Sequence, residues 1–257
     1  MLKLSPTKIN TYLNCPFKYK CDCDWDLRQK YHKDTPELIF GSLIHDCLDD
    51  LYKKVEKKDR SLEKLRLLFE KRFKDDWDKH KKVFGSKRDI VHYVELAKLT
   101  FKNFVESEFF KVEPFSTEEY PKFMLNPDIE VGGKFDRIDV KGKKITLIDY
   151  KTGKLRRNGS VDDFQLDFYE YLLKKTKPEY EVKEKIYYYL TENEILRYEG
   201  GEDRMAQTEE KILEVAEMIN TDKGFDPTPN SLCAYCNYRE ICPIMQGSSN
   251  PGSWSTI

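Results

Sequence analysis

The spacing of the apolar residues changes once along this chain, near Pro114, and this change limits the folds available to it. Before that point apolar side chains recur three and four residues apart, which predicts amphipathic helices over residues 6–15, 36–55, 61–80 and 89–111. After it apolar and polar residues alternate, which predicts strands over residues 115–125, 128–140, 143–151, 183–190 and 195–199. Two further helices are predicted in this part, over residues 160–175 and 203–220. The pattern predicts an α/β fold with a helical N-terminal segment.

Composition and charge exclude several classes of protein. Hydrophobic residues make up 39% of the 257 residues and charged residues 35%, but the 13% of aromatic residues is too high for a disordered chain. The net charge of −1 excludes a simple polycation that coats nucleic acid, although it allows a local basic groove. Because no apolar run approaches the roughly 18 residues of a membrane span and no apolar signal peptide is present, we expect a cytoplasmic protein without a membrane partner. In that reducing compartment the seven cysteines are expected to bind metal or to be buried.

The stretch over residues 133–151 predicts a hairpin with an acidic residue on each strand. If Lys141-Gly142 forms a two-residue turn, Asp136 opposes Leu147 and lies diagonal to Asp149 on the same face. A three-residue loop would place the two carboxylates on opposite faces, because the side chains of a strand alternate. The register of the hairpin therefore decides whether the two acids act together.

Two carboxylates and a lysine on one strand pair suit the hydrolysis of a phosphodiester. Asp149 and Lys151 share a face because they lie two residues apart on a strand. Carboxylates bind hard cations such as Mg²⁺ or Mn²⁺, which polarise a phosphoryl oxygen and lower the pKa of a bound water. A lysine beside the cation can orient that water or offset the charge that develops on phosphorus. The competing interpretation is that these residues and Asp136 are solvated, as many charges in such a chain must be.

Asp136 together with Asp149-Tyr150-Lys151 resembles the D…(D/E)xK core of the PD-(D/E)xK nuclease superfamily. Phe135 stands where the family name implies proline. Four flanking segments resemble the RecB-like branch of that superfamily and follow its order along the chain: Ser5-Pro6-Thr7 with Cys15-Pro16, Gly41-Ser-Leu-Ile-His45, Gln165-Leu-Asp-Phe-Tyr169, and Cys233-x2-Cys236-x5-Cys242-Pro243. Each segment alone is a weak signal, but the ordered set spans nearly the whole chain.

The resemblance implies a restriction-endonuclease-like core, in which helices flank a mixed sheet. It implies one nuclease domain over residues 1–246, with a helical insertion over 53–111 and the core over 112–220, followed by a flexible tail over 247–257. It also implies roles for individual residues. His45, Asp136, Asp149 and the backbone carbonyl of Tyr150 would be metal ligands, Lys151 would be the catalytic lysine, and Gln165 and Tyr169 would support the site or contact DNA. Either Glu118 or Glu119 would match an upstream acidic position.

The cysteine segment over residues 233–242 resembles that of the iron–sulfur nucleases of this branch, such as the AddB-type nuclease domain and the CRISPR-adaptation exonucleases. The ligands that the resemblance implies are Cys15, Cys233, Cys236 and Cys242, which would hold a [4Fe–4S] cluster or, alternatively, Zn²⁺. Such a centre would clip the N-terminal helix to the C-terminal segment. Cys21 or Cys23 could replace Cys15 as a ligand, and thiols without a metal are the remaining alternative.

Basic residues follow the strand of Lys151 at Lys154, Arg156 and Arg157, where they would contact DNA phosphates or belong to a solvated loop. No GxxxxGK motif is present, so unwinding of a duplex would need a helicase partner. The resemblance implies a metal-dependent DNA exonuclease that acts on single strands or free ends, in DNA repair, recombination or CRISPR adaptation. Two alternatives stay open: an endonuclease that processes flaps or prespacers with the same core, and a non-catalytic DNA-binding subunit of a recombination complex.

Overall fold

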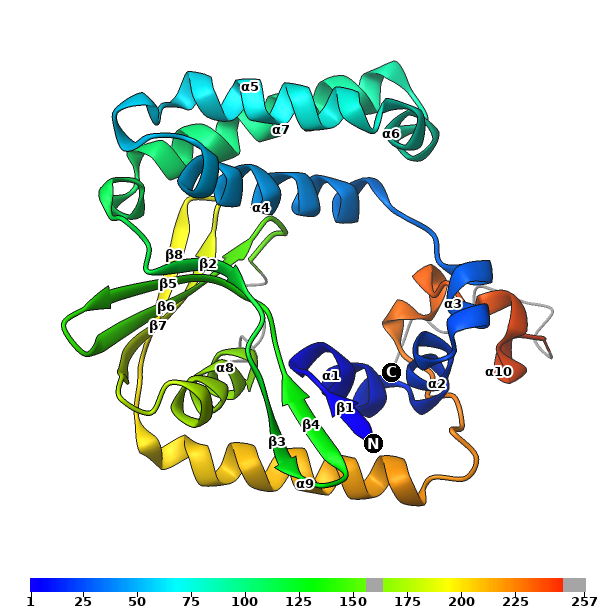
Figure 1. Cartoon of the computed structure of the whole chain (residues 1–257). Helices are drawn as coiled ribbons and strands as arrows, with labels where there is room; N and C mark the ends of the chain where they lie inside the picture. Colours follow the sequence, from blue (N-terminus) through cyan, green and yellow to red (C-terminus); the bar gives the residue numbers. More distant parts are fainter. Residues whose placement is uncertain (156–163, 247–257) are drawn as a thin grey trace. The chain divides into compact units, whose positions relative to one another are not determined.

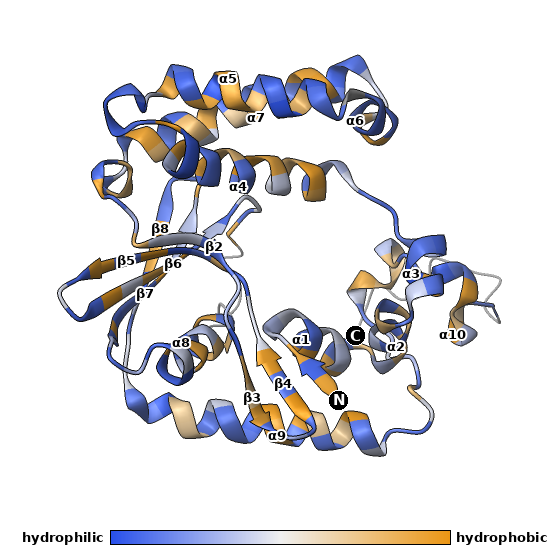
Figure 2. Cartoon of the chain, viewed as in Figure 1, coloured by the Kyte–Doolittle hydropathy of each residue, from blue (hydrophilic) through white to orange (hydrophobic). Residues whose placement is uncertain are grey.

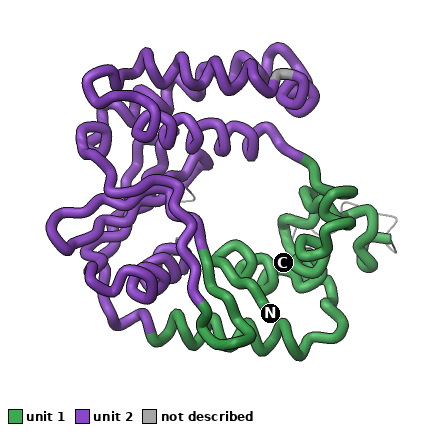
Figure 3. Tube along the Cα trace, in the orientation of Figure 1, with its two compact units in different colours: residues 1–33, 124–132, 206–257 green, residues 34–123, 133–205 purple. Residues whose placement is uncertain are grey.

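The computed structural model describes residues 1–155 and 164–246 of the chain (Figure 1). The predicted helix start at residue 160 and the predicted tail over 247–257 lie outside the described residues. The chain divides into two compact units (Figure 3): unit 1 comprises residues 1–33, 124–132 and 206–257, and unit 2 comprises residues 34–123 and 133–205. The prediction of a single nuclease domain over residues 1–246 is not tested by this division into two units.

Unit 1 combines short helices with a three-stranded sheet of order β1-β4-β3, in which β1 and β4 run parallel. Its elements are β1 (Leu2–Leu4), α1 (Pro6–Asn14), α2 (Pro16–Cys23), α3 (Trp25–Tyr31), β3 (Lys122–Asn126, which begins in unit 2), β4 (Ile129–Gly132), α9 (Met205–Thr221), α10 (Pro243–Gln246) and the 3₁₀ helices η4 (Ser231–Tyr235) and η5 (Arg239–Ile241). Helix α1 begins as predicted, because the Ser5 side chain accepts the Lys8 N–H and Pro6 occupies the first helical position. The apolar pattern predicts neither α2 nor α3, and α3 buries no residue that would have produced a signal.

Unit 2 contains a five-stranded sheet of order β2-β5-β6-β7-β8. Its strands are β2 (Ser116–Glu119), β5 (Phe135–Lys141), β6 (Lys144–Lys151), β7 (Glu181–Tyr189) and β8 (Glu194–Glu199). Strands β6 and β7 run parallel, whereas the other neighbouring strands run antiparallel, so the sheet is mixed. The predicted α/β class with a restriction-endonuclease-like mixed sheet is confirmed.

Helices of unit 2 cover both faces of this sheet (Figure 1). They are α4 (Pro36–Lys54), α5 (Leu62–Asp75), α6 (Trp77–Phe84), α7 (Lys87–Glu106), α8 (Phe164–Thr176) and the 3₁₀ helices η1 (Lys57–Asp59), η2 (Glu108–Lys111) and η3 (Glu202–Arg204). Helices α4, α5 and α7 share one apolar core with Ile148 of β6 and Ile186 of β7. Helix α8 lies on the opposite face, where its Asp167 contacts Lys185 of β7.

The helical predictions for this unit hold with one exception. Residues 36–55 correspond to α4, and residues 89–111 correspond to α7 followed by η2. The helix predicted over 61–80 is interrupted at Asp76, which separates α5 from α6. Figure 2 shows the mixture of hydrophilic and hydrophobic residues along α5 and α7 that an amphipathic helix requires. None of the helices described has the length and apolar character that a bilayer span demands.

Two predicted strands are each divided in the structure. The strand predicted over 115–125 breaks at Tyr120-Pro121, because proline has no N–H to donate to a strand ladder. The strand predicted over 128–140 breaks at Gly133-Lys134, where β4 has ended in the unit 1 sheet and β5 begins in the unit 2 sheet. Every second residue over 129–137 is buried, so the alternation continues from β4 into β5. The sequence pattern therefore does not indicate that the two strands belong to different sheets.

The turn between β5 and β6 differs from the predicted one. It consists of Gly142-Lys143, with Gly142 in the left-handed region at φ +65°, so Ile138 pairs with Leu147. The predicted register, which paired Asp136 with Leu147, is therefore wrong by two residues. Because the shift is even, Asp136 and Asp149 keep a common face, and extending the observed register places them directly opposite each other.

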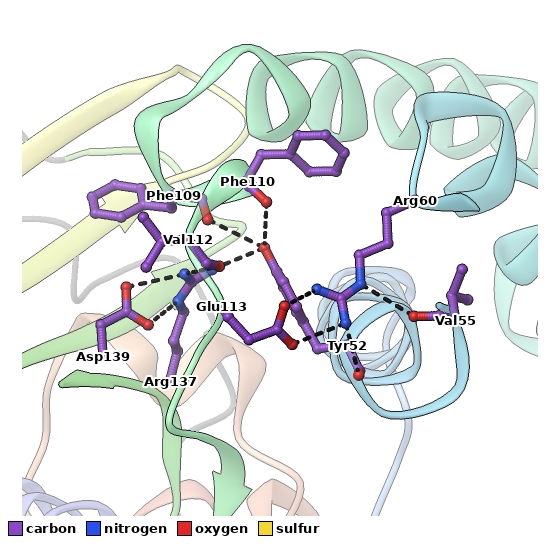
Figure 4. A network of polar contacts seen from close by, with 9 residues as sticks. All are labelled: Tyr52, Val55, Arg60, Phe109, Phe110, Val112, Glu113, Arg137 and Asp139. Atoms are coloured by element: carbon purple, nitrogen blue, oxygen red, sulfur yellow. Dashed lines mark hydrogen bonds and ion pairs between the residues drawn. The ribbon is translucent and has the colours of Figure 1, made fainter. Parts of the chain in front are cut away.

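A buried polar network fixes β5 to the helices on one face of the sheet (Figure 4). The guanidinium of Arg137 is fully buried and donates to both carboxylate oxygens of Asp139, at 2.7 and 3.0 Å. It also donates to Tyr52 Oη and to the Val112 carbonyl, each at 3.0 Å. An unpaired buried charge would cost several kcal/mol. The hydrogen bonds of its guanidinium therefore allow Arg137 to lie at the centre of the core. The network thereby sets the position of β5 and of Asp136 beside α4.

Candidate active site

Side chains from five elements of unit 2 meet where β5 begins and β6 ends. They are His45 of α4, Glu118 of β2, Asp136 of β5, Asp149 and Lys151 of β6, and Gln165 and Tyr169 of α8. Asp149 and Lys151 point to the same face of β6 because they lie two residues apart on a strand. Gln165 and Tyr169 share one face of α8 because they lie four residues apart on a helix. The register of β5 and β6 then joins Asp136 to the pair on β6.

An imidazole and two carboxylates form the first half of this site. His45 Nδ1 lies 3.2 Å from Asp136 Oδ1 and 3.5 Å from Glu118 Oε1. In the described part of the chain, these three residues are the one group whose ligand-type atoms all lie within 4.8 Å of one another. Carboxylate oxygens and an imidazole nitrogen are suitable ligands for a divalent cation such as Mg²⁺ or Mn²⁺.

Glu118, and not Glu119, supplies the acid of β2. The Glu119 carboxylate pairs with Lys177 at 2.9 Å. Glu118 has φ +52°, a left-handed conformation that costs a non-glycine residue about 1 kcal/mol, and the register of β2 leaves it beside Asp136. Strained backbone of this kind concentrates at functional sites, where the rest of the structure holds it in place. The sequence leaves both glutamates open because it does not encode this backbone conformation.

The second half of the site is a hydrogen-bonded chain around Lys151. Its ammonium lies 2.6 Å from Asp149 Oδ2, 2.8 Å from Gln165 Oε1 and 4.8 Å from the ring centre of Tyr187. Gln165 Nε2 donates to Asp149 Oδ1 and to Tyr169 Oη, each at 2.9 Å. The single amide of Gln165 therefore holds the lysine, the carboxylate and the tyrosine in one arrangement.

The charges of the site shift the pKa values of its members. Burial alone would lower the pKa of His45. The charge of Asp136 and hydrogen bonds to Asp136 and Glu118 have the larger, opposite effect and raise this pKa to about 10. Burial and the charge of Asp136 raise the pKa of Asp149 to about 6, against the opposing effect of Lys151. Burial raises the pKa of Glu118, but its contacts with the charged groups of His45 and Lys134 outweigh burial and lower it.

Two buried carboxylate oxygens in the site, Glu118 Oε2 and Asp149 Oδ2, accept no hydrogen bond from the residues that the structure describes. Each is instead paired with a lysine ammonium, Lys134 at Glu118 and Lys151 at Asp149. Buried polar atoms are normally satisfied, so exceptions indicate a ligand or a catalytic role. The carboxylates of Glu118 and Asp136, together with the imidazole of His45, fit a divalent cation.

Three residues near the site carry no sequence signal of their own. Lys134 precedes β5, and Tyr187 reaches Lys151 only because β7 lies next to β6. Gly133 is needed for packing, since a Cβ there would lie 2.8 Å from Cε1 of Tyr169. These contacts follow from the order of the strands, which no local pattern specifies.

The other predicted site residues have different surroundings. The backbone N–H of Tyr150 donates to Asp136 Oδ2 at 2.7 Å, while its ring lies in the core on the opposite face of the sheet. Its carbonyl as a metal ligand stays a prediction. Lys154 is exposed, and Arg156 and Arg157 lie outside the described residues, so their contacts with DNA also stay predictions.

The predicted cysteine ligands all belong to unit 1. Cys15 precedes α2, and Cys233, Cys236 and Cys242 lie in or beside η4 and η5. Burial raises the pKa of both Cys236 and Cys242, and the charges of Cys15 and Cys233 add to each rise, so the four thiols are neighbours. Within the described chain, no three of these sulfurs lie within 4.8 Å of one another.

The alternative ligands Cys21 and Cys23 differ from each other. Cys21 is buried, and burial together with the charges of Asp22, Cys236 and other neighbours raises its pKa to about 11. Cys23 is exposed at the end of α2. Cys21 therefore lies near the predicted cluster and remains a candidate to replace Cys15.

Comparison with known proteins identifies the family. A crystal structure of a provisionally named exonuclease from Eubacterium rectale aligns with a TM-score of 0.54 at 12% sequence identity, over 92% of this chain and 87% of that one. The crystal structure of SSO0001 aligns with a TM-score of 0.40 at 18% identity, over 81% of this chain and 97% of that one. No curated protein sequence matches the chain. The sequence profile of the PD-(D/E)XK nuclease superfamily matches residues 3–243, and the chain belongs to this superfamily.

Proposed function

We propose that this nuclease is a metal-dependent deoxyribonuclease that degrades DNA from free ends and prefers single strands. The observation that carries the proposal is the juxtaposition of the His45, Glu118 and Asp136 group with a lysine fixed beside a buried carboxylate. The fold relationship to a provisionally named exonuclease supports action at DNA ends. The RecB-like order of motifs along the chain supports the same substrate class.

Each residue of the site has a proposed task. His45, Glu118 and Asp136 would hold the cation, with Asp149 and the Tyr150 carbonyl as further ligands. A bound Mg²⁺ or Mn²⁺ would supply Lewis acidity toward the scissile phosphate and a water of lowered pKa. Lys151 would stabilise the negative charge that develops on the phosphate, because its ammonium is positioned before the substrate arrives.

Gln165 and Tyr169 have supporting roles in this mechanism. The Gln165 amide accepts from Lys151 and donates to Asp149, so it fixes the distance between the two groups. The Tyr169 hydroxyl accepts the second N–H of that amide and thereby fixes its orientation. Partners of this kind commonly contribute about 10- to 100-fold to metal affinity or activity.

We further propose that Cys15, Cys233, Cys236 and Cys242 hold a [4Fe–4S] cluster in unit 1. The Cys233-x2-Cys236-x5-Cys242-Pro243 segment, which resembles that of the iron–sulfur nucleases, supports this centre. The effects of Cys15 and Cys233 on the pKa of both Cys236 and Cys242 support a common ligand set. By analogy with a disulfide, closing a loop of more than 200 residues would stabilise the fold by about 5 kcal/mol, so the cluster would have a structural role.

The proposed substrate, single-stranded DNA, determines which partners the nuclease would need. A nuclease without a phosphate-binding loop would act on DNA that is already single-stranded, or would depend on a helicase partner. Lys154, Arg156 and Arg157 would contact the phosphates next to the site. A cytoplasmic role in DNA repair, recombination or CRISPR adaptation is consistent with these features.

The test is cleavage of end-labelled linear and circular single-stranded DNA by the full chain, purified without oxygen, in Mg²⁺, Mn²⁺ or EDTA. We expect loss of the linear DNA only in the presence of metal, intact circles, and no cleavage by Lys151→Ala. The control is Lys144→Ala, which removes an exposed lysine from the other end of β6 and should leave the rate unchanged. Cut circles would favour the endonuclease alternative, and DNA binding without cleavage in any metal would overturn the proposal.

A further inference from the structure

Lys134 lies beside the proposed metal ligands, and the proposed mechanism gives it no task. It stands directly before β5, two residues ahead of Asp136. Its ammonium forms an ion pair with Glu118, whose carboxylate is only 10% exposed, while the lysine side chain itself is 55% exposed. The ammonium of Lys134 therefore contacts a buried carboxylate, while the methylene groups of its side chain are exposed to solvent.

We propose that Lys134 is a resident counter-cation of the metal-ligand group, which occupies Glu118 and is exchanged out when a divalent cation binds. The inference rests on the proposed metal site of His45, Glu118 and Asp136. Its consequence is that Lys134 sets the free concentration of Mg²⁺ or Mn²⁺ at which the site fills, and hence at which the nuclease becomes active.

The proposed metal ligands carry closely spaced negative charges. The carboxylates of Glu118 and Asp136 both lie within 3.5 Å of one imidazole nitrogen, so they are close enough to repel each other strongly. A third carboxylate, of Asp46, also acts on Lys134: burial lowers the pKa of the lysine, but Glu118 raises it, and Asp136 and Asp46 add to the rise. An ammonium is therefore electrostatically favoured at this position.

Lys134 reaches Glu118 from the solvent side. Its ammonium contacts Glu118 Oε2, while most of its stem is exposed. The ammonium can therefore leave the carboxylate for water without disturbing packed side chains, and another cation can take its place. Lysine suits such an exchange, because a flexible four-carbon stem carries its charge.

A second lysine of the same unit, Lys185, is held in a different way. The ammonium of Lys185 lies between Asp167 and Glu170, at 2.5 and 2.6 Å, and the whole residue is only 2% exposed. That lysine has no path to solvent and two directed hydrogen bonds, so it cannot be displaced without disrupting α8. Lys134 has one partner and an open path, as an exchangeable counter-ion requires.

The experiment is a calorimetric titration of Mn²⁺ into full-length protein freed of divalent cations by dialysis. The variant Lys134→Gln should bind Mn²⁺ about tenfold more tightly, since it removes a competing charge from the ligand group. Lys134→Arg, which keeps the charge, should bind like the wild type. The matched control is Lys183→Gln, because Lys183 is 54% exposed, pairs with Glu181 and lies on the same sheet; its Mn²⁺ affinity should not change.

A second readout separates exchange from a merely structural role. Without metal, Lys134→Gln should melt at a lower temperature than the wild type, and Mn²⁺ should raise its melting temperature by more than it raises that of the wild type. An unchanged or weaker Mn²⁺ affinity in Lys134→Gln, in a protein whose binding is abolished by Asp136→Asn, would overturn the inference and leave the metal site intact. Absence of Mn²⁺ binding by both the wild type and Lys134→Gln would overturn the metal site together with the inference.

Discussion

Unit 2 contains two clusters of buried charge on the α8 side of its sheet, and they differ in how completely they are satisfied. In the Lys185 cluster, Asp167 also accepts from Arg204 at 3.1 Å, and Glu170 accepts the Gly201 N–H at 2.7 Å. Both carboxylates of that cluster therefore use both of their oxygens. In the candidate active site, by contrast, the partners of Glu118 Oε2 and Asp149 Oδ2 among the described residues are the partly exposed ammonium groups of Lys134 and Lys151.

The difference separates a structural ion cluster from a site that is prepared for a ligand. Burial of a carboxylate costs free energy in both places, and both contain a lysine that offsets part of the cost. A completed set of hydrogen bonds leaves a cluster no capacity for a further partner. Carboxylate oxygens whose partners are partly exposed ammonium groups, beside an imidazole, remain accessible to a divalent cation. The predictions below test this distinction, beginning with the largest effect.

Removal of the site lysine should abolish activity without unfolding the protein. We expect Lys151→Ala to lower the cleavage rate by about 10⁴-fold, which corresponds to roughly 5 kcal/mol of lost transition-state stabilisation. The free energy of unfolding should change by less than about 1 kcal/mol, because the lysine is partly exposed and Asp149 can stay paired with Gln165. Single-turnover cleavage and urea denaturation measure the two quantities. A variant with near-normal cleavage would show that the cluster is structural.

Removal of the Lys185 charge should have the opposite consequence. Lys185→Met leaves two carboxylates buried without their shared cation, so we expect it to lower the free energy of unfolding by about 3–5 kcal/mol. Any folded fraction should keep most of its activity per molecule. Urea denaturation beside Lys183→Met, an exposed lysine of the same strand, provides the comparison. A loss no greater than that of the control would contradict the assignment of a structural cluster.

The imidazolium of the site should make stability depend on pH when EDTA is present. The folded-state pKa of His45, about 10, lies above its ordinary value of 6.5. Its contribution is therefore fully present below pH 6.5 and is lost as the pH rises toward 10. A shift of this size corresponds to a fall of up to about 5 kcal/mol in the free energy of unfolding over this range. Denaturation curves at several pH values should be flatter for His45→Gln, and parallel curves for the two proteins would refute the assignment.

The smallest effect is expected for the bridging amide. Gln165→Leu keeps the volume of the side chain but releases Lys151 and Tyr169, so the cleavage rate should fall by about 10- to 30-fold. Gln165→Glu is the informative companion, because it preserves the acceptor for Lys151 while it adds a charge beside Asp149. Its affinity for Mn²⁺, measured by titration, should differ from that of Gln165→Leu. Identical rates for Gln165→Leu and the wild type would exclude a positioning role.

Local spacing explains why so much of the site is predictable from the sequence. Asp149 and Lys151 are two apart on a strand, and Gln165 and Tyr169 are four apart on a helix, so short-range geometry fixes each pair. The choice between the two glutamates of β2 depended on one backbone dihedral angle. The contact between Glu118 and Lys134 depended on how the strands are ordered, which no local pattern specifies.

The class of the fold was also predictable from the sequence, but some of its connections were not. The strand and helix periods identify the class correctly, because burial on one face imposes them on the sequence. The position of the turn was misjudged by one residue, since Lys141-Gly142 and Gly142-Lys143 both satisfy the composition of a tight turn. The division of residues 128–140 between two sheets was missed because alternation records burial but not the identity of the partner strand.

Anomalous diffraction from crystals soaked in Mn²⁺ tests most directly whether His45, Glu118 and Asp136 hold a divalent cation. We predict a strong anomalous peak within about 2.4 Å of His45 Nδ1 and of oxygens from Glu118 and Asp136. The Lys134 ammonium should have moved away from Glu118 in the same crystal. Well-ordered side chains without a peak between them at saturating Mn²⁺ would contradict the account.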